Sequence, residues 1–223
     1  MPAQIKPRAR RPSWRASPLP RGRHGLSSQA VRASQRSRLQ RAMLELVAQH
    51  GYAATSVPQV VSAARVSRNA FYEHFADKEA CFLALCEEEA AQLSEEVAAA
   101  AAREHDWRMA LRSGIGATLQ WWHERPQFAR AYFAELPTAG ARAIEQRLRA
   151  YLPFEEMFRQ VASWARRGSK SKDLRERSPR LLIVAITEMI AVEVRAGRVA
   201  RLPELEHDLV HAAEALLGPQ RPL

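Results

Sequence analysis

The chain has 223 residues, of which 47% are hydrophobic and 26% charged, and its formal net charge is +10. This composition allows a substantial core in one large or two small domains. No apolar run approaches the roughly 20 residues that a membrane span requires, and no apolar segment follows the first arginines as it would in a signal peptide. We therefore expect a soluble, cytoplasmic protein with no membrane partner.

The excess positive charge is concentrated at the N-terminus. Eleven basic and no acidic side chains precede Glu45, whereas the rest of the chain carries 23 basic and 24 acidic ones. Residues 1–33 also hold five prolines and almost no large aliphatic side chains, which predicts a disordered basic arm. Arginine binds phosphate bidentately, so such an arm beside a DNA-reading helix would raise affinity in a salt-dependent way. A solubilising tail and an organellar transit peptide are the alternatives.

From Ser34 onward the apolar residues recur near the helical period, and no alternating strand pattern appears, so an all-α fold is predicted. The first helix is expected to begin at about Ser34 and to end at Gly51. Its buried face would hold Leu39, Met43, Leu46 and Val47. A second helix is expected to begin at Ser56, with Pro58 in its first turn, where a missing N–H costs little.

After a turn at Arg65-Val66, a short third helix is predicted with Ser67 as its cap, and Asp77 is expected to cap a fourth helix. Phe71 and Phe75 lie four residues apart and should fill a small core. The outer face would then carry Arg68, Asn69 and Tyr72. Short helices separated by tight turns in this way are typical of a helix-turn-helix DNA-binding domain, which we place at residues 34–84.

These residues resemble the DNA-binding domain of TetR/AcrR-family transcriptional regulators. The motifs that carry the resemblance are Gly51-Tyr52, Thr55-Ser56-Val57, Ala63-Ala64, Val66-Ser67, Phe71-Tyr72, His74-Phe75 and Asp77-Lys78-Glu79. The family implies an N-terminal helix-turn-helix three-helix domain that binds a double-stranded DNA operator. It also implies that residues 85–223 form a C-terminal helical ligand-binding and dimerisation domain.

The resemblance assigns roles to seven residues of the first domain. Arg68 and Asn69 correspond to base-reading positions, and Ala70 is expected to meet a thymine methyl group. Arginine with guanine and asparagine with adenine are the favoured pairs, each contributing about 1–3 kcal/mol of discrimination. The positions that correspond to phosphate contacts are Ser56, Tyr72, His74 and Lys78. Ser56 as a helix cap alone and His74 as a packed or solvated histidine are the alternatives.

Two residues depart from the family's usual pattern. Arg65 stands in the turn where members usually have glycine, at a position that often takes a positive φ. Pro58 stands where relatives often present a basic or polar side chain to DNA. We therefore expect an operator that is read by fewer groups.

Aromatic and methionine side chains are frequent between residues 107 and 164, and such a lining suits a cavity for a hydrophobic or aromatic small molecule. The alternative is that most of them simply fill the core. The candidate pocket residues are Trp107, Leu111, Ile115, Trp122, Phe128, Tyr132, Phe133, Met157, Phe158 and Trp164.

The segment 181–192 is apolar around nearly its full circumference, and the final helix carries an apolar stripe. A helix without a polar side needs a cover, which a partner subunit would supply. Burial within one chain is the alternative. The candidate dimer contacts are Leu181, Leu182, Ala185, Met189, Val192, Leu205, Leu209, Ala212 and Leu216. In such a homodimer two reading helices about 34–36 Å apart would meet an inverted-repeat operator.

Neither an enzyme nor a cofactor site is predicted. The sequence contains no glycine-rich phosphate loop, no G-x-S-x-G and no H-E-x-x-H motif. His207 and His211 share a helix face but have no third metal ligand. Cys81 and Cys86 are interpreted as core residues. We expect a homodimeric repressor that a hydrophobic small-molecule effector releases. The alternatives are an activator, a regulator that answers to a protein partner, and a helical enzyme.

Overall fold

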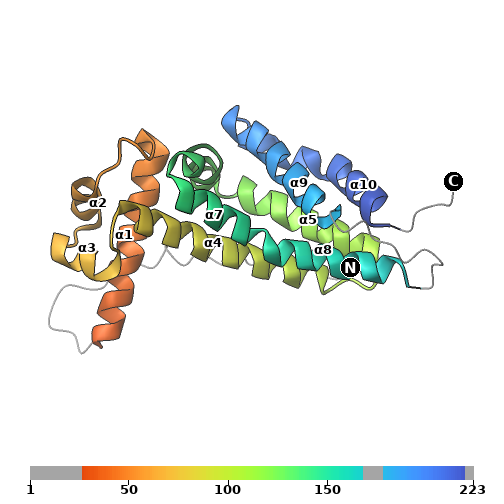
Figure 1. The fold of residues 1–223 in the computed structure, drawn as a ribbon, viewed down its shortest axis with the longest axis horizontal. Helices are drawn as coiled ribbons and strands as arrows, with labels where there is room; N and C mark the ends of the chain where they lie inside the picture. The colour runs from red at the N-terminus through yellow and green to blue at the C-terminus, as the bar shows by residue number, and fades with distance from the viewer. Residues whose placement is uncertain (1–26, 168–177, 219–223) are drawn as a thin grey trace, which may run out of the picture.

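The computed structural model describes residues 27–167 and 178–218, and within these ranges the chain is all-α, as predicted. Three helices form one end of an elongated molecule, and α4 runs from there along the remaining helices (Figure 1). We call residues 28–84 the head and residues 85–218 the body. The helices are α1 (Ser28–His50), α2 (Val57–Ala64), α3 (Arg68–His74), α4 (Lys78–Ala101), α5 (Trp107–His123), α6 (Pro126–Arg130), α7 (Ala141–Ala150), α8 (Leu152–Ala165), α9 (Ser178–Arg195) and α10 (Glu206–Leu217).

Three further short helical segments connect these elements. A π-helical turn, η2 (Ala131–Glu135), continues from α6 and is followed by the 3-10 turn η3 (Leu136–Thr138). A second 3-10 segment, η4 (Val199–Leu205), joins α9 to α10. Among the described residues, none of the helices combines the length and the apolar character needed to cross a membrane.

The start of α1 corrects the sequence prediction. The N-cap is Ser27, whose hydroxyl accepts a hydrogen bond from the Ala30 N–H at 3.2 Å, so residues 28–33 are helical rather than part of the arm. Ser34 lies within the helix because no proline or glycine follows Ser27 until Gly51. Residues 1–26, the rest of the predicted arm, lie outside the described part of the chain.

The other predicted helix ends of the head are confirmed. The Ser67 hydroxyl accepts a hydrogen bond from the Ala70 N–H at 3.1 Å, and the Asp77 carboxylate accepts one from the Ala80 N–H at 2.6 Å. Each such cap stabilises its helix by about 1 kcal/mol. Gly51 ends α1 with a φ of 85°. These caps and this glycine fix where the short helices turn.

Arg65 adopts the left-handed conformation that glycine would adopt more easily, with φ 52° and ψ 48°. This conformation costs about 1 kcal/mol for a residue with a Cβ atom. The Arg38 guanidinium on α1 donates hydrogen bonds to the carbonyl oxygens of Ala64 and Arg65, at 3.2 and 3.3 Å. The turn between α2 and α3 thus forms without a glycine, and the hydrogen bonds from Arg38 connect it to α1.

The head has a filled core. Phe71 and Phe75, the predicted core pair, are buried with their ring centroids 5.8 Å apart. Leu39, Met43 and Val47 from α1 are fully buried beside them, whereas Leu46 is only partly buried. Because α1, α2 and α3 share this core, the orientation of α3 is set by packing.

Candidate functional site

The outer face of α3 presents the polar side chains that the sequence singled out. Arg68 and Asn69 are exposed in the first turn, directly after the Ser67 cap. Tyr72 follows one turn later with 47% of its surface exposed, and its ring centroid lies 5.8 Å from the Arg68 guanidinium carbon. The opposite side of α3 packs into the head through Phe71. A rigid helix thus holds one arginine, one asparagine and one tyrosine toward solvent.

Ala70 departs from this expectation. Its side chain is only 8% exposed, because position 70 falls on the packed side of α3 together with Phe71. The prediction that Ala70 meets a thymine methyl group is therefore wrong for this conformation of the head.

The first half of α1 lies against the end of α3. His74 shares a hydrogen bond of 3.3 Å between its Nε2 atom and the Gln35 side-chain oxygen. Burial lowers the pKa of His74, and the positive charges of Arg32 and Arg36 lower it further. His74 is therefore neutral at pH 7, and the basic charge at this end of α3 comes from the two arginines of α1.

Lys78 and Ser56 both make contacts within the protein. The Lys78 ammonium donates to the carbonyl oxygens of Tyr52 and Thr55, at 3.0 and 2.9 Å. An ammonium has three N–H donors, so one remains for a phosphate. The Ser56 backbone N–H and hydroxyl both donate to the Gln59 side-chain oxygen, at 2.8 and 2.6 Å. Both residues hold the turn before α2, and their contacts with DNA stay a prediction.

One carboxylate of the body reaches the same turn of the head. Glu135, the last residue of η2, accepts a hydrogen bond from the Tyr52 backbone N–H at 2.8 Å. A Cβ atom at Gly51 would lie only 3.1 Å from the Glu135 carboxylate oxygen, so glycine leaves room for this approach. The Tyr52 ring also stacks on Phe82 of α4, with centroids 5.3 Å apart. The α1–α2 turn is thus tied to η2 and to α4.

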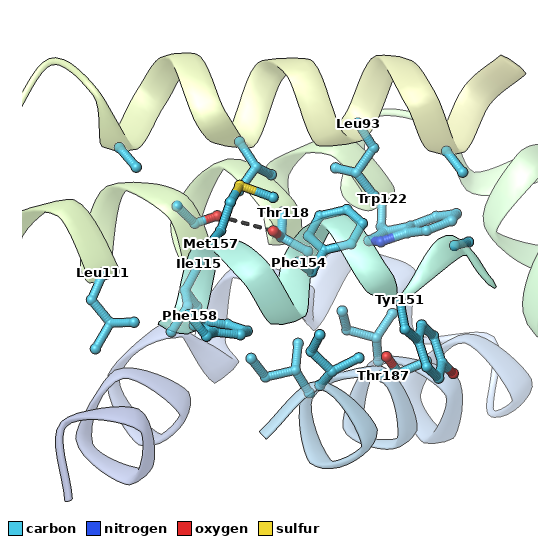
Figure 2. A pocket seen from close by; sticks show the side chains of 18 of the residues that line it. Leu93, Leu111, Ile115, Thr118, Trp122, Tyr151, Phe154, Met157, Phe158 and Thr187 are labelled. Carbon is cyan, nitrogen blue, oxygen red and sulfur yellow. Dashed lines mark hydrogen bonds between the residues drawn. The ribbon is translucent and has the colours of Figure 1, made fainter. Parts of the chain in front are cut away.

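The body encloses an apolar cavity between α4, α5, α8 and α9 (Figure 2). About 100 Å³ of it is accessible to the centre of a water molecule. Leu93 of α4, Met157 of α8 and Thr187 of α9 line it from three sides. Its lining also includes Tyr132 and Phe133, which belong to the same π-helical turn as Glu135. The wall of the cavity and the contact with the head are therefore parts of one short segment.

The predicted pocket residues divide into two groups. The cavity is lined by seven of them, Leu111, Ile115, Trp122, Tyr132, Phe133, Met157 and Phe158. Phe128 instead stacks behind Trp122, with centroids 5.4 Å apart, and Trp107 lies beside the end of α10 at Gly218. Trp164 is partly buried and faces Arg167. These three aromatic side chains fill the core, as the alternative interpretation held.

Several lining residues were not candidates in the sequence. Phe154 and Thr187 line the cavity, as do small residues such as Gly114. A small or singly polar side chain carries no pattern that distinguishes a cavity wall from an ordinary helix contact. Only the packing of four helices around one space reveals them.

Comparisons with known proteins agree with the geometry of the head. A profile described as "Bacterial regulatory proteins, tetR family" matches residues 41–85. The HTH-type transcriptional repressor AcnR of Corynebacterium efficiens is 46% identical over 50 residues, which are 22% of this chain and 27% of that protein. AcnR of Corynebacterium glutamicum matches with the same identity and coverage. The match thus spans about a quarter of the length of these relatives.

The comparison with solved structures extends over the body. The fatty acid degradation regulator FadR of Bacillus halodurans superposes with a TM-score of 0.70 at 17% identity, covering 82% of this chain and 98% of that one. FadR of Bacillus subtilis, whose structure contains stearoyl-CoA, superposes with a TM-score of 0.71 at 16% identity and the same coverage. At these identities the likeness establishes the fold.

The head of the chain is thus similar to the DNA-binding domain of TetR-family regulators.

The last two long helices of the chain carry the predicted dimer contacts. One side of α9 packs inside the chain through Leu182, Ile186 and Ile190. Only the other side of this helix therefore faces solvent. Leu209 of α10 is likewise buried in its own chain and Leu205 is partly buried. Leu182 and Leu209 are therefore unavailable to a partner, contrary to the prediction.

The opposite side of α9 is exposed and mostly apolar. Leu181, Val184 and Val192 are 58%, 49% and 49% exposed, and they follow the helical spacing of one stripe. Ala185 and Met189 lie on the same stripe. On α10, Ala212 and Leu216 are also exposed. The solvent face of the last helices thus keeps six of the predicted contacts, Leu181, Ala185, Met189, Val192, Ala212 and Leu216.

Proposed function

We propose that this protein is a DNA-binding transcriptional repressor that acts as a homodimer and is released from its operator by an apolar effector. The observation that carries the proposal is the outer face of α3, where Arg68, Asn69 and Tyr72 are exposed on a helix fixed by its Ser67 cap and by Phe71. The family of the head and the repressor relatives that match it support this reading.

Arg68 and Asn69 are the side chains we assign to base edges. Both lie in the first turn of α3, which is the part of a recognition helix that enters the major groove. Tyr72, together with Arg32 on the exposed start of α1, is assigned to the phosphates. Pro58 presents no polar side chain from α2, and the Gln59 side-chain oxygen is hydrogen-bonded to Ser56. We therefore assign most of the sequence-specific contacts to α3.

The exposed stripe on α9 supports a homodimer. An apolar stripe of this kind is costly in water and is covered when a second copy packs against it across a two-fold axis. Two copies of α3 would then read the two halves of an inverted repeat. The operator is accordingly proposed to be palindromic.

The cavity is proposed as the effector site, and η2 as its connection with the head. Tyr132 and Phe133 line the cavity, whereas Glu135 of the same turn binds the Tyr52 N–H. An effector that moves the two aromatic side chains also moves the carboxylate. Operator binding then weakens to the extent that the effector prefers the moved conformation.

The test begins with a map of the sites that the protein occupies on its own genome. Palindromic bound sequences are expected, and they supply the duplex for a fluorescence anisotropy titration. Tight binding to this duplex but not to a scrambled one supports the proposal. A monomer in sedimentation, or equal affinity for both duplexes, would exclude it.

The basic arm is proposed to add phosphate contacts. Deletion of residues 1–26 leaves the Ser27 cap of α1 intact. If the arm binds phosphates, the deletion lowers operator affinity and makes it less dependent on salt concentration. An unchanged affinity and salt dependence would show that the arm is a passive tail.

A further inference from the structure

The cavity in the body borders a second hollow, and Tyr151 is their shared wall. This hollow has a volume of about 240 Å³ and lies between η3, α7 and α9. Its lining includes Leu136, Ile144, Val184 and Tyr151. Tyr151 lines the apolar cavity as well, and Figure 2 shows its ring beside Thr187 at one end of that cavity. The two spaces thus share Tyr151 as a lining residue at this end.

Arg147 places a positive charge at this wall. Its Nε atom donates a hydrogen bond to the Tyr151 hydroxyl at 3.0 Å, and its side chain lines the second hollow. Other arginines of α7 are paired with carboxylates, Arg142 with Asp77 and Glu79 and Arg149 with Glu145. Arg147 forms no ion pair within residues 27–167 and 178–218. Its remaining N–H donors are available to an anion.

The apolar cavity itself contains no charge. All the side chains that line it are uncharged, and its polar groups are hydroxyls and one indole N–H. Burial raises the pKa of Tyr132 strongly, so this phenol also stays neutral. Leu111, Met157 and Phe158 line one end, and the Thr118 hydroxyl beside Met157 donates its hydrogen bond to the Gly114 carbonyl oxygen (Figure 2). A carboxylate placed there would lose its hydration without gaining a counterion.

The cavity also has a length. Along α5 its lining runs from Leu111 to Trp122, a rise of roughly 16 Å at the helical 1.5 Å per residue. The apolar end therefore lies a long way from the end at Tyr151. This polarity suits a molecule with an extended apolar chain and a single polar terminus.

We propose that the effector is an anionic amphiphile whose apolar chain lies in the cavity and whose head group passes Tyr151 to pair with Arg147. This inference rests on the proposed effector site and adds the chemical class of its ligand. Arg147 is the specificity-determining residue, because it supplies the counterion that the cavity lacks. Tyr151 holds the guanidinium in place before the head group arrives.

The experiment measures binding of dodecanoate and of dodecan-1-ol to the full chain by isothermal titration calorimetry. Both probes have the same apolar chain, whose length is comparable to that of the cavity. They differ in the charge of the head group. Dodecanoate is expected to bind more tightly. Arg147→Gln should weaken dodecanoate about 10- to 100-fold, as expected for the loss of a charge-assisted hydrogen bond, and leave dodecan-1-ol unchanged.

Two further variants distinguish the loss of the Arg147 charge from a general disturbance of α7. Arg147→Lys keeps the charge and should restore part of the dodecanoate affinity. Arg149→Gln removes an exposed arginine two residues away that lines neither space, and it should have no effect. Thermal unfolding of each variant checks that α7 remains packed.

The possible results are distinct. If both probes bind equally and Arg147→Gln changes neither, the anionic head group is excluded while the cavity remains an effector site. If neither probe binds the unmodified chain, the amphiphile class is excluded. The proposed repressor function is judged independently, because operator binding in the anisotropy titration needs no effector.

Discussion

The head packs short helices around a filled core, whereas the body surrounds a cavity with long helices. In the head, Phe71 and Phe75 fill the core, so the polar side chains of α3 lie on its solvent-facing side. In the body, Tyr132 and Phe133 line the cavity. The head therefore presents its polar side chains on a packed helix, while the body contains the proposed effector site.

The comparisons show the same contrast. A 50-residue stretch matches transcriptional repressors at 46% identity, whereas superpositions over 82% of the chain stand at 16–17%. A surface that reads DNA restricts which residues are allowed at each position. A helical body needs only apolar residues at suitable spacing, so many sequences adopt it. The head accordingly indicates a function, and the body indicates a fold.

The largest effect is expected from emptying the core of the head. Phe71→Ala removes a fully buried ring and should cost about 3–5 kcal/mol of stability, with loss of operator binding. Denaturant unfolding followed by circular dichroism measures it. Tyr72→Ala, on the exposed face next to it, is the matched control. It should weaken operator binding with little loss of stability, and equal destabilisation by the two variants would contradict the assignment of faces.

A smaller effect is expected from the reading surface itself. Arg68→Ala should weaken operator binding by about 1–3 kcal/mol and relax the preference at one base pair of each half-site. Anisotropy with a set of singly substituted operators measures both. Arg108→Ala removes an exposed arginine from the body and should leave the affinity unchanged. Similar losses from both would mean that only net charge matters.

Substitution of Glu135 should weaken the coupling between effector binding in the body and operator binding by the head. Glu135→Ala removes the acceptor of the Tyr52 N–H and costs about 1 kcal/mol of net hydrogen bonding. The variant should still bind the effector, but the effector should no longer shift operator affinity fully. Glu135→Gln keeps an acceptor oxygen and should retain most of the coupling. Unchanged coupling in the alanine variant would place the connection elsewhere.

The smallest effect is a pH dependence from His74. Its pKa is lowered from the ordinary 6.5 in the folded head, so the unfolded chain binds the proton more readily. Stability from His74 is therefore full above pH 6.5 and is lost as the pH falls toward the lowered pKa. Melting temperatures measured across this range should fall less steeply for His74→Gln. Parallel curves would show that other groups cause the dependence.

The head could be predicted well from sequence because its signals are local. The Ser67 and Asp77 caps and the Gly51 terminus each act within a few residues, and the structure confirms them. The predicted start of α1 at Ser34 is too late, because the helix is capped by Ser27 and continues through Ser34 without interruption. The expected contact of Ala70 with a thymine methyl group is not met because its side chain is buried on the packed side of α3.

The contacts that join the two regions could not be predicted from sequence. Glu135 lies 83 positions from Tyr52, and no sequence motif indicates that the two residues are in contact. Likewise, α9 has apolar residues on every side, so the sequence does not distinguish the side facing its own chain from the exposed one. The contact of Glu135 with Tyr52 and the buried side of α9 both depend on packing between residues that are far apart in the sequence.

The two cysteines of α4 have a practical consequence. Burial raises the pKa of the Cys81 thiol to about 12, and burial also raises that of Cys86. A thiolate is needed for alkylation, so each sulfur reacts only when its surroundings open transiently. Cys81 lies next to the core of the head, and Cys86 lies farther along α4 at the start of the body. The rates at which iodoacetamide modifies them, resolved by mass spectrometry, report separately on fluctuations of the two regions without an added label.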